Sequence, residues 1–130
     1  MKKTVLTLFL LSIISGWALS AQSKPEVTFK KDSHDFGTIY EEIGTVSTQF
    51  EFTNTGKSPV IIQRVHTSCG CATPGYTREP VLPGKKGHVS VRYTTTGRPY
   101  AFSKNITVYT NVPDTVYILN IKGKVIRKGN

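Results

Sequence analysis

The sequence lacks the patterns on which most enzymes and helical proteins depend. It contains no Ser-His-Asp spacing, no phosphate-binding glycine loop and no His-x-x-x-His motif. It also has no segment in which apolar residues keep the period of about 3.6 residues that marks an amphipathic helix. We therefore expect a fold without long helices and a protein that is not an enzyme. A hydrolase is disfavoured because no nucleophile can be paired with a base.

Acidic residues are scarce. The chain has 8 Asp and Glu against 17 Lys and Arg. Once Lys2 and Lys3 are removed with the N-terminal segment, 15 basic residues remain against the same 8 acids, a net charge of about +7. Such a charge favours acidic surfaces, such as lipid head groups or polysaccharide. A secreted chain without an arginine cluster or a stacking motif rarely meets nucleic acid, so we expect no nucleic-acid partner.

The one long apolar run lies at the N-terminus, in residues 1–21. Lys2 and Lys3 precede the run Val5–Ile14, and small residues follow, with Ala18-Leu19-Ser20 as a cleavage site. This order is typical of a secretory signal peptide. The run is short for a membrane span of about 20 residues, and no cysteine lies near the cleavage site to carry a lipid. We expect a secreted protein of the periplasm or cell envelope, with no transmembrane span after cleavage.

Short β-strands separated by turns are predicted beyond a polar segment at residues 22–32. In that segment, Val27–Phe29 forms either a tail or a short edge strand. In Val46–Phe52, apolar and threonine side chains alternate with polar ones, the period of a half-buried strand. The denser apolar run Val60–Val65 predicts a central strand. Further strands are predicted at His34–Tyr40, His88–Tyr93, Phe102–Tyr109 and Val116–Val125.

About seven short strands in roughly 100 residues predict an all-β fold, an immunoglobulin-like β-sandwich over residues 33–130. A small open barrel is the competing architecture. The sandwich would have no disulfide between its sheets, because both cysteines lie in one loop and the only tryptophan, Trp17, lies in the signal peptide. We therefore expect the core alone to hold the sheets together.

Both cysteines lie in the segment His66-Thr67-Ser68-Cys69-Gly70-Cys71. Three interpretations fit this spacing. A Cys69–Cys71 disulfide would close a small, strained ring that is easily reduced. Two thiolates would instead suit Cu(I) or zinc, with His66, His34 or His88 as a further ligand. In the third interpretation, the cysteines only shape a tight loop.

Polar positions outside the cysteine segment have simpler interpretations. The loop continues to Pro80, and its two prolines and two glycines exclude a helix or a central strand. Asp35 is predicted to bond the amides of a turn. Glu41 and Glu42 are predicted to lie in a solvated loop, and Arg98 in a turn.

Several motifs that are weak individually become specific in combination. They are His34-Asp35-Phe36-Gly37-Thr38-Ile39, Phe50 to Gly56, Ser68-Cys69-Gly70-Cys71, Pro83 to Gly87, and Tyr93 to Arg98. In this order they resemble the bacterial family called domain of unknown function 1573, from about Asp35 to Val125. The resemblance implies a secreted Ig-like sandwich related to Hydin-type domains, in a family without an established activity. Members often have Thr after the second cysteine, where this chain has Ala72.

Together these observations predict a non-catalytic binding module of the cell envelope. Its partner would be an envelope protein or an acidic surface. The 66–80 loop and the basic C-terminal strand, with Lys122, Lys124, Arg127 and Lys128, are the predicted contacts. The alternative is a periplasmic thiol redox or copper-handling protein that uses Cys69 and Cys71 with His66. Apart from copper in that alternative, no cofactor is expected.

Overall fold

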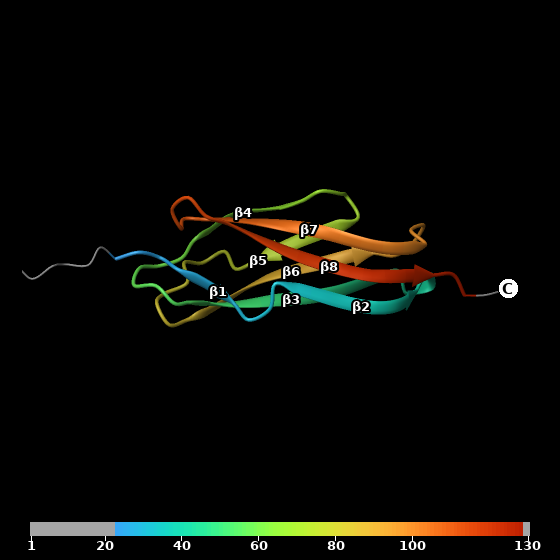
Figure 1. Ribbon diagram of the computed structural model, residues 1–130, viewed down its shortest axis with the longest axis horizontal. Helices are drawn as coiled ribbons and strands as arrows, with labels where there is room; N and C mark the ends of the chain where they lie inside the picture. The colour runs from blue at the N-terminus through green and yellow to red at the C-terminus, as the bar shows by residue number, and fades with distance from the viewer. Residues whose placement is uncertain (1–22, 129–130) are drawn as a thin grey trace, which may run out of the picture.

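The computed structural model describes residues 23–128 as two packed β-sheets (Figure 1). The signal peptide predicted at residues 1–21 lies outside the described residues. Within them the chain forms eight strands and one short 3₁₀ turn, η2 (Glu41–Ile43). The predicted all-β sandwich is confirmed.

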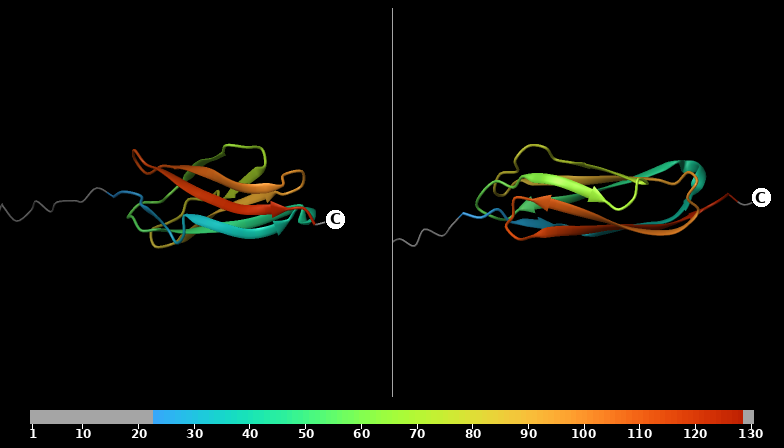
Figure 2. Two further views of the ribbon diagram at one scale, coloured as in Figure 1. Left: turned by 45° about the vertical axis from the view of Figure 1, so that its right-hand side comes forward. Right: turned by 90° about the horizontal axis from the view of Figure 1, so that it is seen from above.

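Each sheet contains four strands, and Figure 2 shows the sheets as two layers. Sheet A has the order β1-β3-β6-β5. Its strands are β1 (Val27–Phe29), β3 (Thr45–Asn54), β6 (Lys86–Thr94) and β5 (Ala72–Tyr76). Sheet B has the order β2-β8-β7-β4. Its strands are β2 (Ser33–Tyr40), β8 (Val116–Ile126), β7 (Tyr100–Thr110) and β4 (Ile62–Thr67). Neighbouring strands are antiparallel, except that β2 and β8 are parallel.

The strand period places one face of each sheet in the core. Phe50 and Phe52 of β3 are 2% and 1% exposed, whereas Gln49, which precedes Phe50, faces solvent. Tyr93 of sheet A stacks on Phe102 of sheet B, with 3.9 Å between the ring centroids. The remaining inward residues follow the alternation predicted for their strands. They include Val89, Val91, Leu119, Ile121 and Val125.

The chain changes sheets between β1 and β2. β1 pairs with β3 in sheet A, with Val27 opposite Asn54. β2 then pairs with β8 in sheet B, starting with Ser33 opposite Asn120. The polar segment 22–32 therefore contains an edge strand, one of its two predicted forms. Because the crossing divides one stretch of chain between two sheets, neither strand covers the whole edge of its sheet.

The prediction of a central strand over Val60–Val65 is wrong. β4 begins at Ile62 and is an edge strand that pairs only with β7. The run is dense in apolar residues because Val60 and Ile62 both face the core, at 0% and 6% exposure. Ile61 between them is 42% exposed, so only one face is buried.

The segment predicted as a loop up to Pro80 contains β5, which pairs with β6 from Ala72 to Tyr76. Pro74 has no N–H to donate, and it is tolerated because β5 lies at the edge of sheet A. Gly75 allows a close approach, since a Cβ there would lie 2.7 Å from Ser90 Oγ. The exclusion of a central strand from this segment is therefore correct.

A buried asparagine fixes the turn after β3. Asn54 is 0% exposed. Its Nδ2 donates to the carbonyl oxygens of Ser58 and Val81, both at 2.8 Å. Its Oδ1 accepts from the Gly56 N–H at 2.9 Å. The amide therefore satisfies backbone groups from two separate turns that would otherwise lack partners.

Replacing Asn54 with alanine is expected to lower the free energy of unfolding by about 3 kcal/mol, because it leaves buried backbone groups unsatisfied. Urea denaturation of the protein without residues 1–21 measures this. Asn105→Ala is the matched control, since Asn105 is exposed on sheet B and its side chain accepts only a solvent-exposed hydrogen bond, from Asn120, so its loss should cost less than about 1 kcal/mol. Equal losses for the two variants would contradict the role given to Asn54.

Candidate functional site

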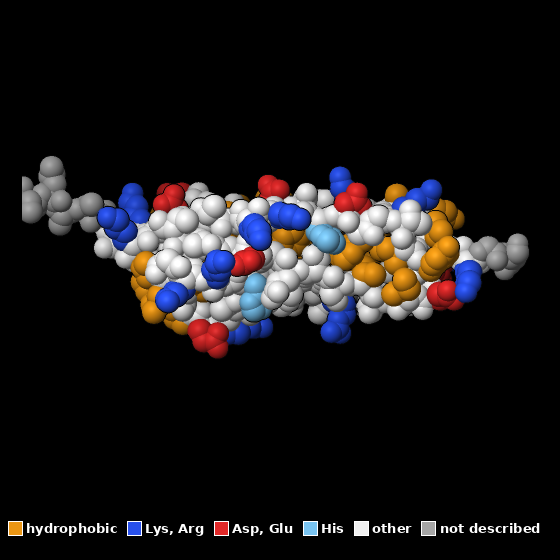
Figure 3. Space-filling model, turned by 90° about the horizontal axis from the view of Figure 1, so that it is seen from below, with side chains coloured by type: hydrophobic (Ala, Val, Ile, Leu, Met, Phe, Trp, Pro, Cys, Tyr) orange, Lys and Arg blue, Asp and Glu red, His pale blue; other side chains and the backbone are white. Residues whose placement is uncertain are grey.

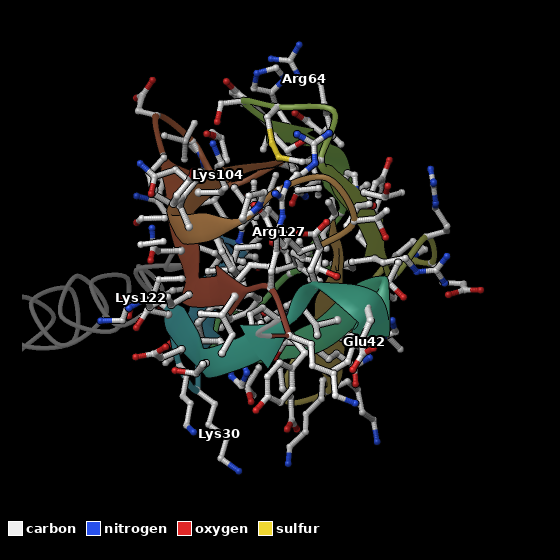
Figure 4. All side chains as sticks on the ribbon, turned by 90° about the vertical axis from the view of Figure 1, so that its right-hand side faces the viewer. Lys30, Glu42, Arg64, Lys104, Lys122 and Arg127 are labelled. Atoms are coloured by element: carbon white, nitrogen blue, oxygen red, sulfur yellow. A yellow bond between two sulfur atoms is a disulfide. The ribbon has the colours of Figure 1, made fainter. Side chains whose placement is uncertain are left out.

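The Cys69-Gly70-Cys71 segment forms a corner between the two sheets. It connects β4, at the edge of sheet B, with β5, at the edge of sheet A. In the structure Cys69 and Cys71 are joined by a disulfide, which Figure 4 shows at this edge of the sandwich. The bond spans a single residue, so it fixes the corner locally and does not connect distant strands.

Backbone and hydroxyl hydrogen bonds hold this corner. The Thr67 hydroxyl lies 3.2 Å from the Cys69 carbonyl oxygen and 3.1 Å from that of Ala72, and it donates to these two acceptors. The Thr94 N–H of β6 donates to the Cys71 carbonyl at 2.9 Å. Thr67 is not singled out by the sequence, because a threonine before the cysteines has no distinctive spacing.

The two cysteines differ in exposure. Cys71 is 2% exposed and belongs to the core, next to Ala72 at 4%. Cys69 is half-buried and packs against the core from outside. Cys69 is therefore the more accessible of the two cysteines to a molecule in solution.

The histidines lie in separate places. His66 is exposed on β4, opposite Thr107 of β7. His34 packs edge-on against Phe36, and His88 Nδ1 lies 3.2 Å from the Thr77 hydroxyl. Among residues 23–128, no three His, Cys, Asp or Glu side chains gather closely enough to hold a metal ion.

Ion pairs engage two of the four basic residues that the sequence predicts as contacts near the C-terminus. Arg127 Nε lies 3.0 Å from Glu41 Oε2, and Lys128 Nζ lies 3.5 Å from Glu42 Oε1. Both pairs lie at the end of the sandwich that faces the viewer in Figure 4, where Glu42 and Arg127 are labelled. Lys122 and Lys124 remain exposed on β8.

Glu41 is not the solvated loop residue that the sequence predicts. Its side chain is only 22% exposed. Besides Arg127, it accepts from the Gly97 N–H at 3.2 Å, and its carbonyl accepts from the Thr95 hydroxyl at 2.9 Å. Glu41 thus connects η2, the C-terminal segment and the turn between β6 and β7.

Large apolar side chains are exposed at this same end. We call Tyr40, Ile43 and Tyr100, which are 48%, 56% and 78% exposed, the end surface. β2 and β7 flank the end of β8, where Tyr40 pairs with Ile126 and Tyr100 with Val125. Figure 3 shows apolar side chains gathered at the end where β2 finishes.

Tyr100 has an unusual backbone conformation, with φ at 96°. Positive φ is uncommon for residues other than glycine and costs about 1–3 kcal/mol. The Tyr100 ring recovers little of this cost through burial, because most of the side chain faces solvent. The sequence gives no sign of this, since the preceding Gly97-Arg98-Pro99 predicts only a turn.

Two predicted turn residues are confirmed. Asp35 Oδ1 accepts from the Gly37 N–H at 2.8 Å. The Arg98 N–H donates to the Thr95 carbonyl at 3.1 Å, which closes the turn between β6 and β7.

Burial raises the pKa of Tyr93, although Arg98 opposes the shift. Burial also raises the pKa of Tyr117. Both phenols therefore stay protonated at neutral pH and serve in packing.

Across residues 23–128, no helix is long and apolar enough to cross a membrane.

Residues 27–125 match the sequence model of a family described as protein of unknown function, DUF1573. The chain belongs to the DUF1573 family. The resemblance noted from the sequence motifs is thereby confirmed. No curated protein matches the chain.

Solved structures share the fold of this DUF1573 domain. A protein of unknown function from Porphyromonas gingivalis W83 is 17% identical, with a TM-score of 0.67 over 82% of this chain and 50% of that one. The secreted serine protease VesC from Vibrio cholerae is 12% identical, with a TM-score of 0.57 over 92% of this chain and 27% of that one. A family 123 glycoside hydrolase from Clostridium perfringens is 10% identical, with a TM-score of 0.58 over 80% of this chain and 28% of that one. The chain spans half or less of each, and identities this low show the fold alone.

Single serine variants of the two cysteines distinguish the contribution of burial to stability from that of the disulfide. Cys69→Ser and Cys71→Ser both remove the disulfide, whose loop-closure contribution is only about 1.6 kcal/mol for so short a loop. Cys71→Ser also places a hydroxyl in the core, so we expect it to cost about 1–2 kcal/mol more than Cys69→Ser. Urea denaturation of the two variants measures the difference. Equal costs would show that Cys71 does not contribute through burial.

Proposed function

We propose that this DUF1573 domain is a non-catalytic binding module of the cell envelope that contacts a protein partner through the end surface. The exposure of Tyr100 at positive φ is the observation that carries the proposal. A residue that costs stability without packing in return is expected where function, and not folding, determines the sequence.

The chemistry of the end surface supports protein binding. Tyrosine is among the residues that contribute most to protein interfaces, because its ring buries a large area with few rotatable bonds. Tyr40 and Ile43 add further exposed apolar side chains at the same end of the sandwich. End loops of a sandwich are also where binding residues commonly lie.

The end surface is held in place before any partner arrives. Glu41 bonds to Gly97 and Arg127, so η2, the turn before Tyr100 and the C-terminal segment are connected. A surface fixed in this way loses less conformational entropy on binding, which favours affinity. The predicted signal peptide supports a location outside the cytoplasm, where an envelope protein is the available partner.

Replacing Tyr100 with glycine tests the end surface without harming the fold. Glycine adopts φ near 96° without strain, so the free energy of unfolding should change by less than about 0.5 kcal/mol or rise. We expect partner recovery from envelope extracts, measured after cross-linking, to fall at least tenfold.

Leu82→Ala is the matched control, because Leu82 is a large apolar residue that is 54% exposed outside the end surface. It should leave partner recovery unchanged. If Tyr100→Gly recovers as much partner as the unchanged protein, the end surface is not the contact.

Thiol exchange at the corner is a second candidate function, and the unequal exposure of the cysteines favours it. A thiolate would attack Sγ of Cys69, form a mixed disulfide with it and release Cys71 as a thiolate. A second thiolate would then release Cys69, so that two electrons reduce the pair. The reduced pair would offer two soft ligands that suit Cu(I).

Incubation with reduced glutathione, followed by alkylation and peptide mass spectrometry, tests this exchange. We expect the glutathione adduct on Cys69 and the alkyl group on Cys71. Cu(I) uptake by the reduced protein is measured in parallel. A disulfide that forms no adduct under these conditions would exclude exchange and leave the corner with a structural role.

A further inference from the structure

Strand β8 is covered on one side along only part of its length. β7 pairs with β8 from Val116 onward. On the other side, β2 begins only at Asn120 of β8. In the described part of the chain, the stretch Val116–Leu119 therefore has no strand beside it on the side away from β7.

Two residues direct backbone groups to this open side. The Asn120 N–H donates to the Asp32 carbonyl at 2.9 Å, so the backbone groups of Asn120 point toward β2. Because these directions alternate along a strand, the N–H and C=O groups of Ile118 and Val116 point the same way. The side chains of Val116 and Ile118 are 51% and 50% exposed.

A groove of about 570 Å³ runs along this open edge. Val116–Leu119 lines one side, and β1 with the crossing segment Lys30–Asp32 lines the other. The half-buried rings of Phe29 and Tyr117 contact each other inside it, with 5.6 Å between centroids. The groove lies between β1 and the beginning of β8, before the point at which β2 starts to pair.

The charge of the groove indicates what fits it. Lys30 and Lys31 line it, and among residues 23–128 neither forms an ion pair. Lys30 extends away from the sandwich in Figure 4. Asp32 is the one acid among the lining residues, and the mature chain carries a net charge of about +7. A second copy paired along this edge would bring two such charges together, which disfavours self-association.

We propose that β8 binds an extended, acidic segment of a protein partner as an added strand over Val116–Leu119. The segment forms backbone hydrogen bonds with Val116 and Ile118. Its apolar side chains enter the groove over Phe29 and Tyr117, and its acidic side chains meet Lys30 and Lys31. Strand addition of this kind uses the backbone for affinity and alternate side chains for specificity.

This site is separate from the end surface, so it stands independently of the function proposed above. The edge strand β5 suits an added strand less well. It contains Pro74, which has no N–H to share.

A labelled peptide of four Glu-Val repeats is a suitable probe, with four Lys-Val repeats as the control of opposite charge. Fluorescence anisotropy with the mature protein measures affinity, and hydrogen exchange measures where the peptide binds. We expect the Glu-Val peptide to bind and to slow amide exchange at Val116 and Ile118 at least tenfold. The Lys-Val peptide should bind at least tenfold more weakly.

Three variants separate the contribution of the backbone from that of charge. Ile118→Pro removes the N–H that faces the open side and leaves the bonds to β7 intact, so affinity should fall at least tenfold. Ile118→Ala keeps that N–H and should lose less. The pair Lys30→Glu and Lys31→Glu alters only exposed side chains, so it tests the charge even if Ile118→Pro does not fold.

Three outcomes would overturn the proposal. The first is no binding of the Glu-Val peptide, which would mean that the two lysines protect a free edge from pairing. The second is equal binding by the charge-reversed variant. The third is a dimer in sedimentation that slows exchange at Ile118 without peptide, which would make a second copy the occupant.

Discussion

Apolar contact between the two sheets is the interaction on which the rest of the structure depends. No disulfide links a strand of one sheet to a strand of the other within the described residues, because the one disulfide there closes a corner of a single intervening residue. The sheets are held by inward side chains such as Phe52, Ile106 and Leu119, all at most 1% exposed, and by the stacking of Tyr93 on Phe102. A core of this kind tolerates little change in shape. Substitutions are therefore better tolerated at the edges and ends of the sandwich than in its core.

The change of sheet after β1 follows from this packing and determines where the molecule remains open. The first stretch of chain contributes to both layers of the core, through Val27 in sheet A and Ile39 in sheet B. Because it divides its length between two edges, it leaves part of β8 unpaired. An exposed edge is normally a liability, since it recruits other chains. Here it lies beside lysines and above a groove, and these two features favour pairing with an acidic segment over other chains.

A structural feature can be predicted from the sequence when the residues that determine it lie close together along the chain. The alternation in Val46–Phe52 is local, and it gives both the strand and its buried face. Strand order depends on contacts distant in sequence, so Val60–Val65 is recognised as a strand but not as an edge. Glu41 is missed for the same reason, because its partner Arg127 lies 86 residues away. The closeness of Cys69 and Cys71 is visible in the sequence, but their unequal exposure arises only from the meeting of β4 and β5.

The parallel pairing of β2 and β8 has a mechanical consequence. The two ends of the described chain leave the sandwich at opposite ends, and both strands run toward the C-terminal end (Figure 1). Tension between the termini would slide β2 along β8 and load the hydrogen bonds from Ser33 to Tyr40 together, instead of opening them one after another. A domain tethered at both ends in the envelope would thus bear force in shear, the direction in which a strand pair resists most strongly.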